Sequence, residues 1–215
     1  MKTLIKDNKE LNYKVIFTSN KHSYLKPKNG FLEIHLSKRM SLKGVLGKIE
    51  SNFDDYYFKT TSNDDNYFML WGKRYQVSLN NDHFSYRLDD SKIIINTTED
   101  FDYKGEIYKQ ELKKYINKIK DEVIQTLSNN NLIWVDIKYK KLKSKYGSYQ
   151  TKKHYITLNT LLAALDKEYA YYVLMHEYAH QKVFNHQKPF YELLAKLYPN
   201  YPIVEKKLRK LIIHF

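Results

Sequence analysis

The chain has 215 residues, 42% of them hydrophobic and 15% aromatic, which excludes a disordered protein and is long enough to bury a core. The absence of cysteine excludes disulfides, a thiolate nucleophile and a metal site with cysteine ligands. The formal net charge of +13 is compatible with an acidic partner such as nucleic acid. No apolar run reaches the roughly 20 residues that span a bilayer, and the N-terminus has no apolar stretch of signal-peptide length, so we expect a cytoplasmic protein without a membrane partner.

The first 100 residues are predicted to form a β-rich region with one helix. Asn29-Gly30 is the strongest hairpin signal, and Ser41 is a suitable N-cap for a helix over about 41–59, followed by a polar loop over 60–66. Alternating and β-branched residues predict strands over 11–17, 31–36, 67–71, 74–79, 84–88 and 92–96. These strands suggest a meander interrupted by the helix, and no internal repeat is evident.

The second half of the chain is predicted to mix helices with a few strands. A long helix over about 106–128 comes first, and residues 145–150 resemble an edge strand. Further strands are expected over 132–140 and 154–158, and further helices over 159–165, 167 to about 184, 188–198 and 201–213. The fold class is therefore α+β, with an N-terminal β-rich region over 1–100 and a second domain over 101–215, or one continuous domain.

The motif His-Glu-x-x-His occurs in the helix expected to begin at Lys167. Because residues four apart lie on one face of a helix, His176 and His180 can direct two imidazoles at one metal ion. Glu177 is offset around the helix, where its carboxylate can take a proton from water without binding the metal. This division of roles is what zinc-dependent hydrolysis requires.

A third histidine, His186, can join the other two only if the helix ends soon after His180. Six residues of continuous helix would put His186 on the wrong side. Asn185 tolerates the left-handed conformation that ends many helices, and Pro189 suits the first turn of a new helix. The sequence therefore predicts a metal site of His176, His180 and His186.

Other zinc peptidases offer two alternatives for the site. Metzincins share the spacing of the third histidine but have Gly where this chain has Val183, and no Met-turn is evident. Gluzincins take their third ligand from a later helix, where Glu192 or Glu205 would serve. His154, Tyr149 or Tyr178 could additionally assist the oxyanion.

The motifs together resemble the YgjP-like metal-dependent peptidases, relatives of the SprT and WLM types. The specific part of the resemblance spans 144–190, and a less specific strand pair lies at 67–77. The matching segments are Lys145 to Tyr149, Ile156 to Asn159, His176 to His180, Asn185-His186 and Phe190. In this chain Tyr146 and Tyr149 replace the usual Trp and Cys of the first segment.

This resemblance implies a zincin-like core, in which the helix with the motif packs on a small, mainly antiparallel sheet. It also implies that His176, His180 and His186 bind Zn2+ and that Glu177 is the general base of a peptidase acting on a protein or peptide. The alternative is a nucleic-acid-associated protein, linked to DNA or the ribosome, that uses lysines 138–145 with neighbouring tyrosines.

Overall fold

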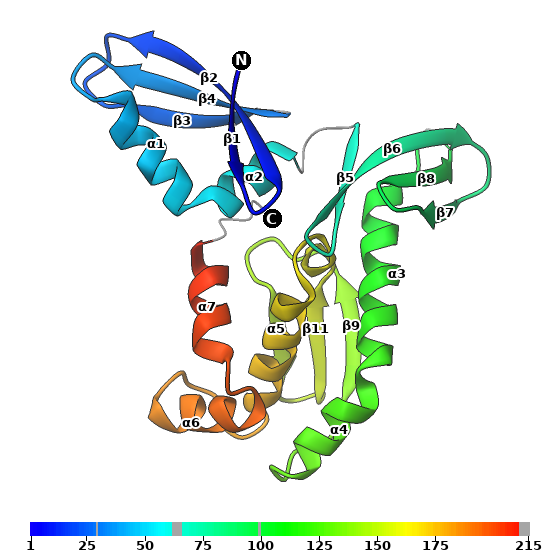
Figure 1. Ribbon diagram of the computed structural model, residues 1–215. Helices are drawn as coiled ribbons and strands as arrows, with labels where there is room; N and C mark the ends of the chain where they lie inside the picture. Colours follow the sequence, from blue (N-terminus) through cyan, green and yellow to red (C-terminus); the bar gives the residue numbers. More distant parts are fainter. Residues whose placement is uncertain (29, 62–65, 99, 211–215) are drawn as a thin grey trace.

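The computed structural model of the protein describes residues 1–28, 30–61, 66–98 and 100–210 (Figure 1). Within these residues it is a mixed α+β structure with three small sheets and seven α-helices. Asn29 of the expected hairpin turn, residues 62–65 of the expected loop and residues 211–213 of the last expected helix lie outside the described residues. No helix in the described part of the chain is long and apolar enough to cross a bilayer.

The first sheet contains four strands in the order β1-β2-β4-β3, where the inner pair β2 and β4 is parallel and each outer pair is an antiparallel hairpin. The strands are β1 (Lys2–Lys6), β2 (Lys9–Thr18), β3 (Tyr24–Lys28) and β4 (Phe31–Ser37). The alternate residues Leu32, Ile34 and Leu36 of β4 are buried. The single helix expected over 41–59 is two helices, α1 (Leu42–Ser51) and α2 (Phe53–Thr61), because the chain leaves helical geometry at Asn52.

The second sheet repeats this arrangement in the order β5-β6-β8-β7, again with a parallel inner pair. Its elements are β5 (Tyr67–Leu70), β6 (Lys73–Asn81), β7 (Ser85–Leu88), β8 (Lys92–Thr97), α3 (Tyr103–Lys118) and α4 (Lys120–Ser128). The expected meander is therefore wrong. The two sheets repeat one strand order, although no repeat is evident in the sequence. Hydrophobic alternation locates strands, but it does not determine which strands pair when the connections are of similar length.

The third sheet is mixed rather than mainly antiparallel, with the order β10-β11-β9. Its strands are β9 (Asp136–Lys140), β10 (Gly147–Gln150) and β11 (Tyr155–Asn159). The β10–β11 pair is antiparallel and the β11–β9 pair is parallel, so β10 is an edge strand as predicted. The remaining elements are the 3-10 helix η1 (Thr160–Ala164), α5 (Lys167–Ala179), α6 (Lys188–Leu197) and α7 (Tyr201–Lys210).

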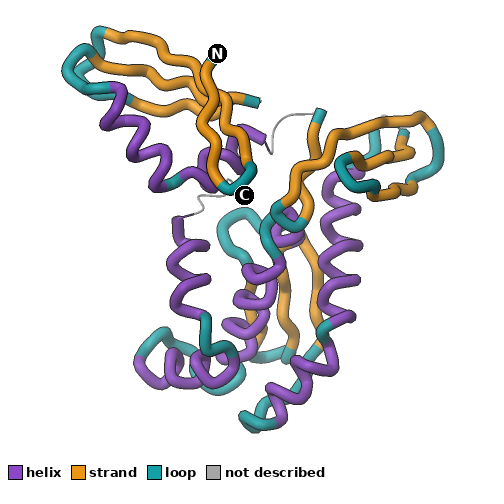
Figure 2. Tube along the Cα trace, in the orientation of Figure 1, coloured by secondary structure: helices purple, strands orange, loops and turns teal. Residues whose placement is uncertain are grey.

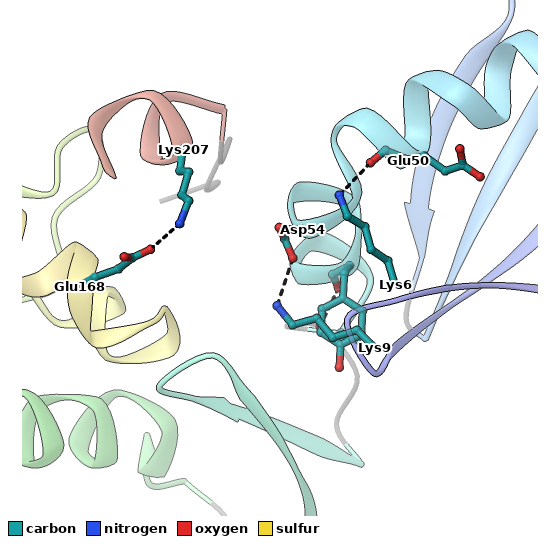
Figure 3. Close-up of polar contacts among 8 residues, drawn as sticks. Lys6, Lys9, Glu50, Asp54, Glu168 and Lys207 are labelled. Carbon is teal, nitrogen blue, oxygen red and sulfur yellow. Dashed lines mark hydrogen bonds and ion pairs between the residues drawn. The ribbon is translucent and has the colours of Figure 1, made fainter. Parts of the chain in front are cut away.

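Helix α5 lies at the centre of the C-terminal half. It packs against β10 and β11 on one side and against α6 and α7 on the other, while α3 lies beside β9 (Figures 1 and 2). Lys207 of α7 donates to Glu168 of α5 at 3.1 Å, which ties these two helices together (Figure 3). The buried apolar side chains form one cluster that runs from the first sheet to α7.

The turn between β5 and β6 docks onto η1, directly before α5. The backbone N–H groups of Trp71 and Gly72 donate to the carbonyls of Ala163 and Ala164, at 2.7 and 3.3 Å. Gly72 has φ +72°, and a Cβ there would collide with the Asp166 carboxylate. Glycine is required at this turn both for its conformation and for the close approach to the start of α5.

Candidate active site

The His-Glu-x-x-His motif lies at the C-terminal end of α5. Apolar side chains from Ala170 to Met175 bury this helix, so the motif enters the site from a rigid, packed element. His176 and His180 lie one turn apart, with ring centroids separated by 5.1 Å. The predicted common face for these two imidazoles is confirmed.

The chain reverses immediately after the motif. Helix α5 ends at Ala179 with His180 as its C-cap, earlier than the end expected near Phe184. The N–H groups of Gln181 and Val183 donate back to the last turn of α5, and Asn185 does not adopt the expected left-handed conformation. The break is thus made by a tight turn after His180, while Pro189 lies in the first turn of α6 as predicted.

The reversal brings His186 to the other two histidines. Its Nε2 lies 3.0 Å from Nε2 of His176, and its ring centroid lies 4.9 Å from that of His180. The potential ligand atoms of His176, His180 and His186 all lie within 4.8 Å of one another. Two imidazole ligands of a tetrahedral zinc ion are about 3.3 Å apart, given Zn–N bonds of about 2.0 Å, so the spacing fits such an ion.

The surroundings of His176 and His180 favour the neutral, ligating form of these two rings. Nδ1 of His180 lies 2.9 Å from the carbonyl oxygen of Val183, so it donates its proton there and leaves Nε2 with a free lone pair. Burial, followed by the neighbouring His180 and His186, lowers the pKa of His176 to about 3. Burial also lowers the pKa of His180. These two imidazoles can therefore bind a divalent cation without first losing protons.

Phe190 of α6 forms an apolar floor under the three imidazoles. Its ring is fully buried, and its centroid lies 4.9, 4.8 and 4.6 Å from those of His176, His180 and His186. An aromatic ring in contact with all three imidazoles restricts their rotation. The sequence marked Phe190 only as a position of resemblance, and gave no indication of this contact.

Glu177 is buried between α5 and the edge strand β10. Burial raises the pKa of its carboxyl group to about 7, partly offset by the backbone N–H of Tyr149, which donates to the carboxylate, and by nearby Lys145. A Cβ on Gly147 would lie 2.8 Å from Oε1 of Glu177 and 2.9 Å from Cγ1 of Val173. The absence of a side chain at Gly147 therefore allows β10 to approach Glu177 closely.

A cleft of about 540 Å³ opens beside these groups. Residues 144–147 form one wall of the cleft, and α7 forms another with Glu205, Leu208 and Arg209. The other lining residues come from α5, α6 and the turn between them: Tyr172, Val173, His176, Glu177, His186 and Tyr191. Glu205 accepts from Arg209 at 2.7 Å and from the hydroxyl of Tyr172. That hydroxyl lies 3.5 Å from Nδ1 of His176. Sequence reasoning missed this α7 wall, because nothing local to 201–210 indicates that it packs beside α5.

The remaining candidates lie outside the cluster of histidines. Glu192 pairs with Lys188 on the surface of α6, and neither Glu192 nor Glu205 belongs to the cluster of potential ligands in the described residues. His154 is exposed and bonds the hydroxyl of Tyr149 at 2.8 Å, outside the residues that line the cleft. Tyr178 is fully buried against Trp134.

The geometry on α5 and α6 is that of a candidate metal-dependent hydrolase, and comparison with known proteins assigns the family. Residues 28–211 match the family described as "YgjP-like, metallopeptidase domain", so the chain belongs to the YgjP-like metallopeptidases. The expected resemblance is confirmed. Membership of this family implies a divalent metal ion and a peptide or protein substrate.

Solved structures of two archaeal proteins are also similar. The metallopeptidase zymogen of Pyrococcus abyssi abylysin is 22% identical, with a TM-score of 0.38 over 47% of this chain and 94% of that chain. The metallopeptidase zymogen of Methanocaldococcus jannaschii jannalysin is 25% identical, with a TM-score of 0.39 over 47% of this chain and 97% of that chain. A search of curated proteins returns no match.

Proposed function

We propose that this metallopeptidase is a zinc enzyme with a zincin-like core, in which His176, His180 and His186 hold the ion and Glu177 is the general base. The observation that carries the proposal is the return of His186 to within 3.0 Å of His176 after the chain reverses at His180. Three imidazoles without a thiolate are a donor set typical of catalytic zinc. The division of the chain into regions 1–100 and 101–215 also remains a proposal, with one continuous domain as the alternative.

The chain supplies the proton transfers that peptide hydrolysis needs. A bound zinc ion would provide Lewis acidity, polarising the substrate carbonyl and acidifying water. The Glu177 carboxylate accepts a proton from the attacking water and then passes it to the leaving amine. Burial raises the pKa of Glu177 to about 7, which suits a group that must both take up and release a proton near neutral pH.

The edge strand β10 is the candidate platform for the substrate backbone. Among the described strands it pairs with β11 alone, and it lies close to Glu177 and contributes Gly147 to the cleft. An extended peptide adding to this edge would gain main-chain hydrogen bonds with little dependence on its side chains. Peptides N-methylated at alternate positions test this: methylation at residues that face β10 should raise KM, and methylation at the intervening residues should not. Equal effects at both sets of positions would contradict strand addition.

Glu177→Gln tests the assigned base. Glutamine keeps an acceptor for the Tyr149 N–H but cannot take up a proton, so we expect unchanged metal content and a loss of about 10²–10⁴-fold in turnover of a peptide library. Glu192→Gln is the matched control, because it makes the same charge change on the exposed surface of α6. Turnover within a few-fold of wild type in Glu177→Gln would refute the role of Glu177.

A further inference from the structure

The net positive charge of the chain is concentrated in one short segment, because that segment has lysines and no acidic residue. Residues 137–165, called here the lysine-rich segment, contain seven of the 37 Lys and Arg residues and none of the 24 Asp and Glu residues. This segment therefore contributes +7 of the net charge of +13. A general bias towards lysine would have spread the excess over the whole chain.

The lysine-rich segment contains β10, β11, η1 and all of β9 except its first residue, Asp136. Its lysines are Lys138, Lys140, Lys141, Lys143, Lys145, Lys152 and Lys153, and all of them are exposed. None of them makes an ion pair with any residue that the structure describes. The sheet next to the cleft thus carries positive charge that the protein itself does not neutralise.

Two cationic side chains line the cleft itself, one from the lysine-rich segment and one from α7. Lys145 lies on the wall that leads into β10, and Arg209 lies on the α7 wall. Glu205 is the carboxylate on that wall, and it is already engaged by Arg209 and by the hydroxyl of Tyr172. The Arg209 side chain is 69% exposed, and a guanidinium has five N–H donors, so donors remain for a second carboxylate.

We propose that the cleft selects polypeptide substrates that carry acidic side chains close to the scissile bond. Lys145 and Arg209 bind the substrate carboxylates, and the other lysines of the lysine-rich segment attract acidic chains to the edge of β10. This inference rests on the proposed function, because it names the substrate class of the same site. It adds charge selection to a backbone platform that by itself would show little sequence preference.

The observations favour an acidic polypeptide over nucleic acid as the partner. Binding of single-stranded nucleic acid without sequence preference relies on exposed aromatic faces on which bases stack. In the lysine-rich segment, Tyr139, Tyr146 and Tyr149 are only partly exposed and pack against the core. The ring of Tyr155 is covered by Lys138, whose Nζ lies 3.7 Å from the ring centroid. His154 is exposed, and its ring is bonded to the hydroxyl of Tyr149. The tyrosines of the segment therefore offer no fully exposed ring for stacking.

Direct binding to zinc-loaded Glu177→Gln protein tests the proposal without turnover. The probes are a fluorescent peptide with two Asp or Glu residues on each side of its central bond, a twin with Asn and Gln at those positions, and a single-stranded DNA of equal charge, with both peptides amidated at the C-terminus. We expect the acidic peptide to bind about fivefold more tightly than its twin at low salt, with the ratio falling as salt rises. Adding Lys145→Gln and Arg209→Gln should bring the ratio towards one.

Lys113→Gln with Lys118→Gln is the control, since it removes the same charge from exposed positions on α3. It should leave the binding ratio unchanged. Equal binding of the two peptides would overturn the proposal, as would tighter binding of the DNA than of the acidic peptide. If leaving the C-terminus of the twin as a free carboxylate raised its binding to that of the acidic peptide, the proposal would also be overturned, since the terminus would then be the ligand.

Turnover by the zinc-loaded wild-type protein separates this proposal from the proposed function. Hydrolysis of both peptides at equal kcat/KM would support a peptidase and contradict charge selection. Hydrolysis of neither peptide, with the preference in binding retained, would refute the proposed function and support the acidic-ligand surface.

Discussion

Residues 2–61 and 67–128 form two units of the same design, four strands in two hairpins followed by two helices, but they contact the rest of the molecule differently. The first hairpin turns at Asp7 and Asn8, with φ of 50° and 60°, and both residues are exposed. Its flanking lysines bond their own unit, Lys6 to the carbonyl of Glu50 and Lys9 to the carboxylate of Asp54 (Figure 3). The corresponding turn of the second unit, at Trp71 and Gly72, is hydrogen-bonded to η1.

The helices differ in the same way. Helix α2 packs mainly on β2, β3 and β4 of its own sheet and also contacts β5 of the second unit, whereas α3 packs on η1 and β9. All residues that line the described cleft come from 144–209, so neither unit contributes to it directly. The second unit is the scaffold that positions α5, and the first unit is an attachment. The two units thus share one arrangement of strands and helices and differ in the parts of the chain that their turns and helices contact.

The largest expected effect comes from filling the space beside Glu177. Gly147→Val would place side-chain atoms where a Cβ is already 2.8 Å from Oε1 of Glu177, so β10 or the carboxylate must move. A shift of about 1 Å in a catalytic group can cost about 100-fold, and we expect at least that loss of peptide turnover. The contrasting change is Gly47→Ala in α1 of the first unit, where a Cβ meets nothing within 4 Å. Gly47→Ala should stabilise the protein by about 0.5–1 kcal/mol and leave kcat unchanged. Wild-type turnover in Gly147→Val would contradict the close approach of β10 to a catalytic Glu177.

A smaller but still large effect is expected at the second hairpin turn. Gly72→Ala combines a left-handed backbone with a collision against Asp166, and we expect a loss of about 2–4 kcal/mol in the free energy of unfolding. Asn8→Ala changes a residue of similar φ at the exposed turn of the first unit, and should cost no more than about 1 kcal/mol. Urea unfolding of both variants measures the difference. Equal losses would mean that docking on η1 contributes nothing.

The buried carboxyl group of Glu177 should make the stability of the metal-free protein depend on pH. The pKa of Glu177 is raised from 4.5 to about 7, so its contribution to stability is fully present below about pH 4.5 and is lost as pH rises through 7. In metal-free protein, Glu177→Gln avoids that loss and should be more stable than wild type by up to about 3 kcal/mol at pH 8, but not at pH 4.5. His176, whose lowered pKa acts in the opposite sense at acid pH, is common to both proteins and cancels. Thermal unfolding in a chelator at the two pH values measures this, and a gap that does not widen with pH would contradict it.

The smallest expected effect is at the surface of the first unit. Lys9 and Asp54 form an ion pair at 3.0 Å, with side chains 29% and 57% exposed. Lys9→Met should therefore change stability by less than about 1 kcal/mol and should not alter kcat/KM for peptides. A marked fall in kcat/KM would show that the first unit is coupled to the cleft after all.

Local sequence signals predict the cluster of three histidines better than they predict the fold. The spacing of His176, His180 and His186, with Pro189 after them, was sufficient to predict a cluster of imidazoles after a helix break, because every determinant lies within 15 residues. The predicted position of the helix break is wrong, because the turn begins at His180 rather than at Asn185. A tight turn made by backbone hydrogen bonds has no strong residue signature.

Long-range pairing was not predictable in the same way. Nothing in the strands indicated that β2 would pair in parallel with β4, or β6 with β8. The α7 wall depends on contacts between residues more than 30 positions apart, such as Glu205 with Tyr172. A single sequence carries the period of each element, but not the partner that its apolar or polar face will meet.

Zinc analysis of His186→Ala is the most direct test of the central claim. His186 is exposed, so the variant should keep the far-UV circular dichroism of wild type. After dialysis against buffer with trace zinc, we predict about one zinc per chain in wild type and in the control His154→Ala, and less than about a tenth of that in His186→Ala. A full equivalent of zinc in folded His186→Ala, held as tightly as in wild type, would contradict the three-histidine site.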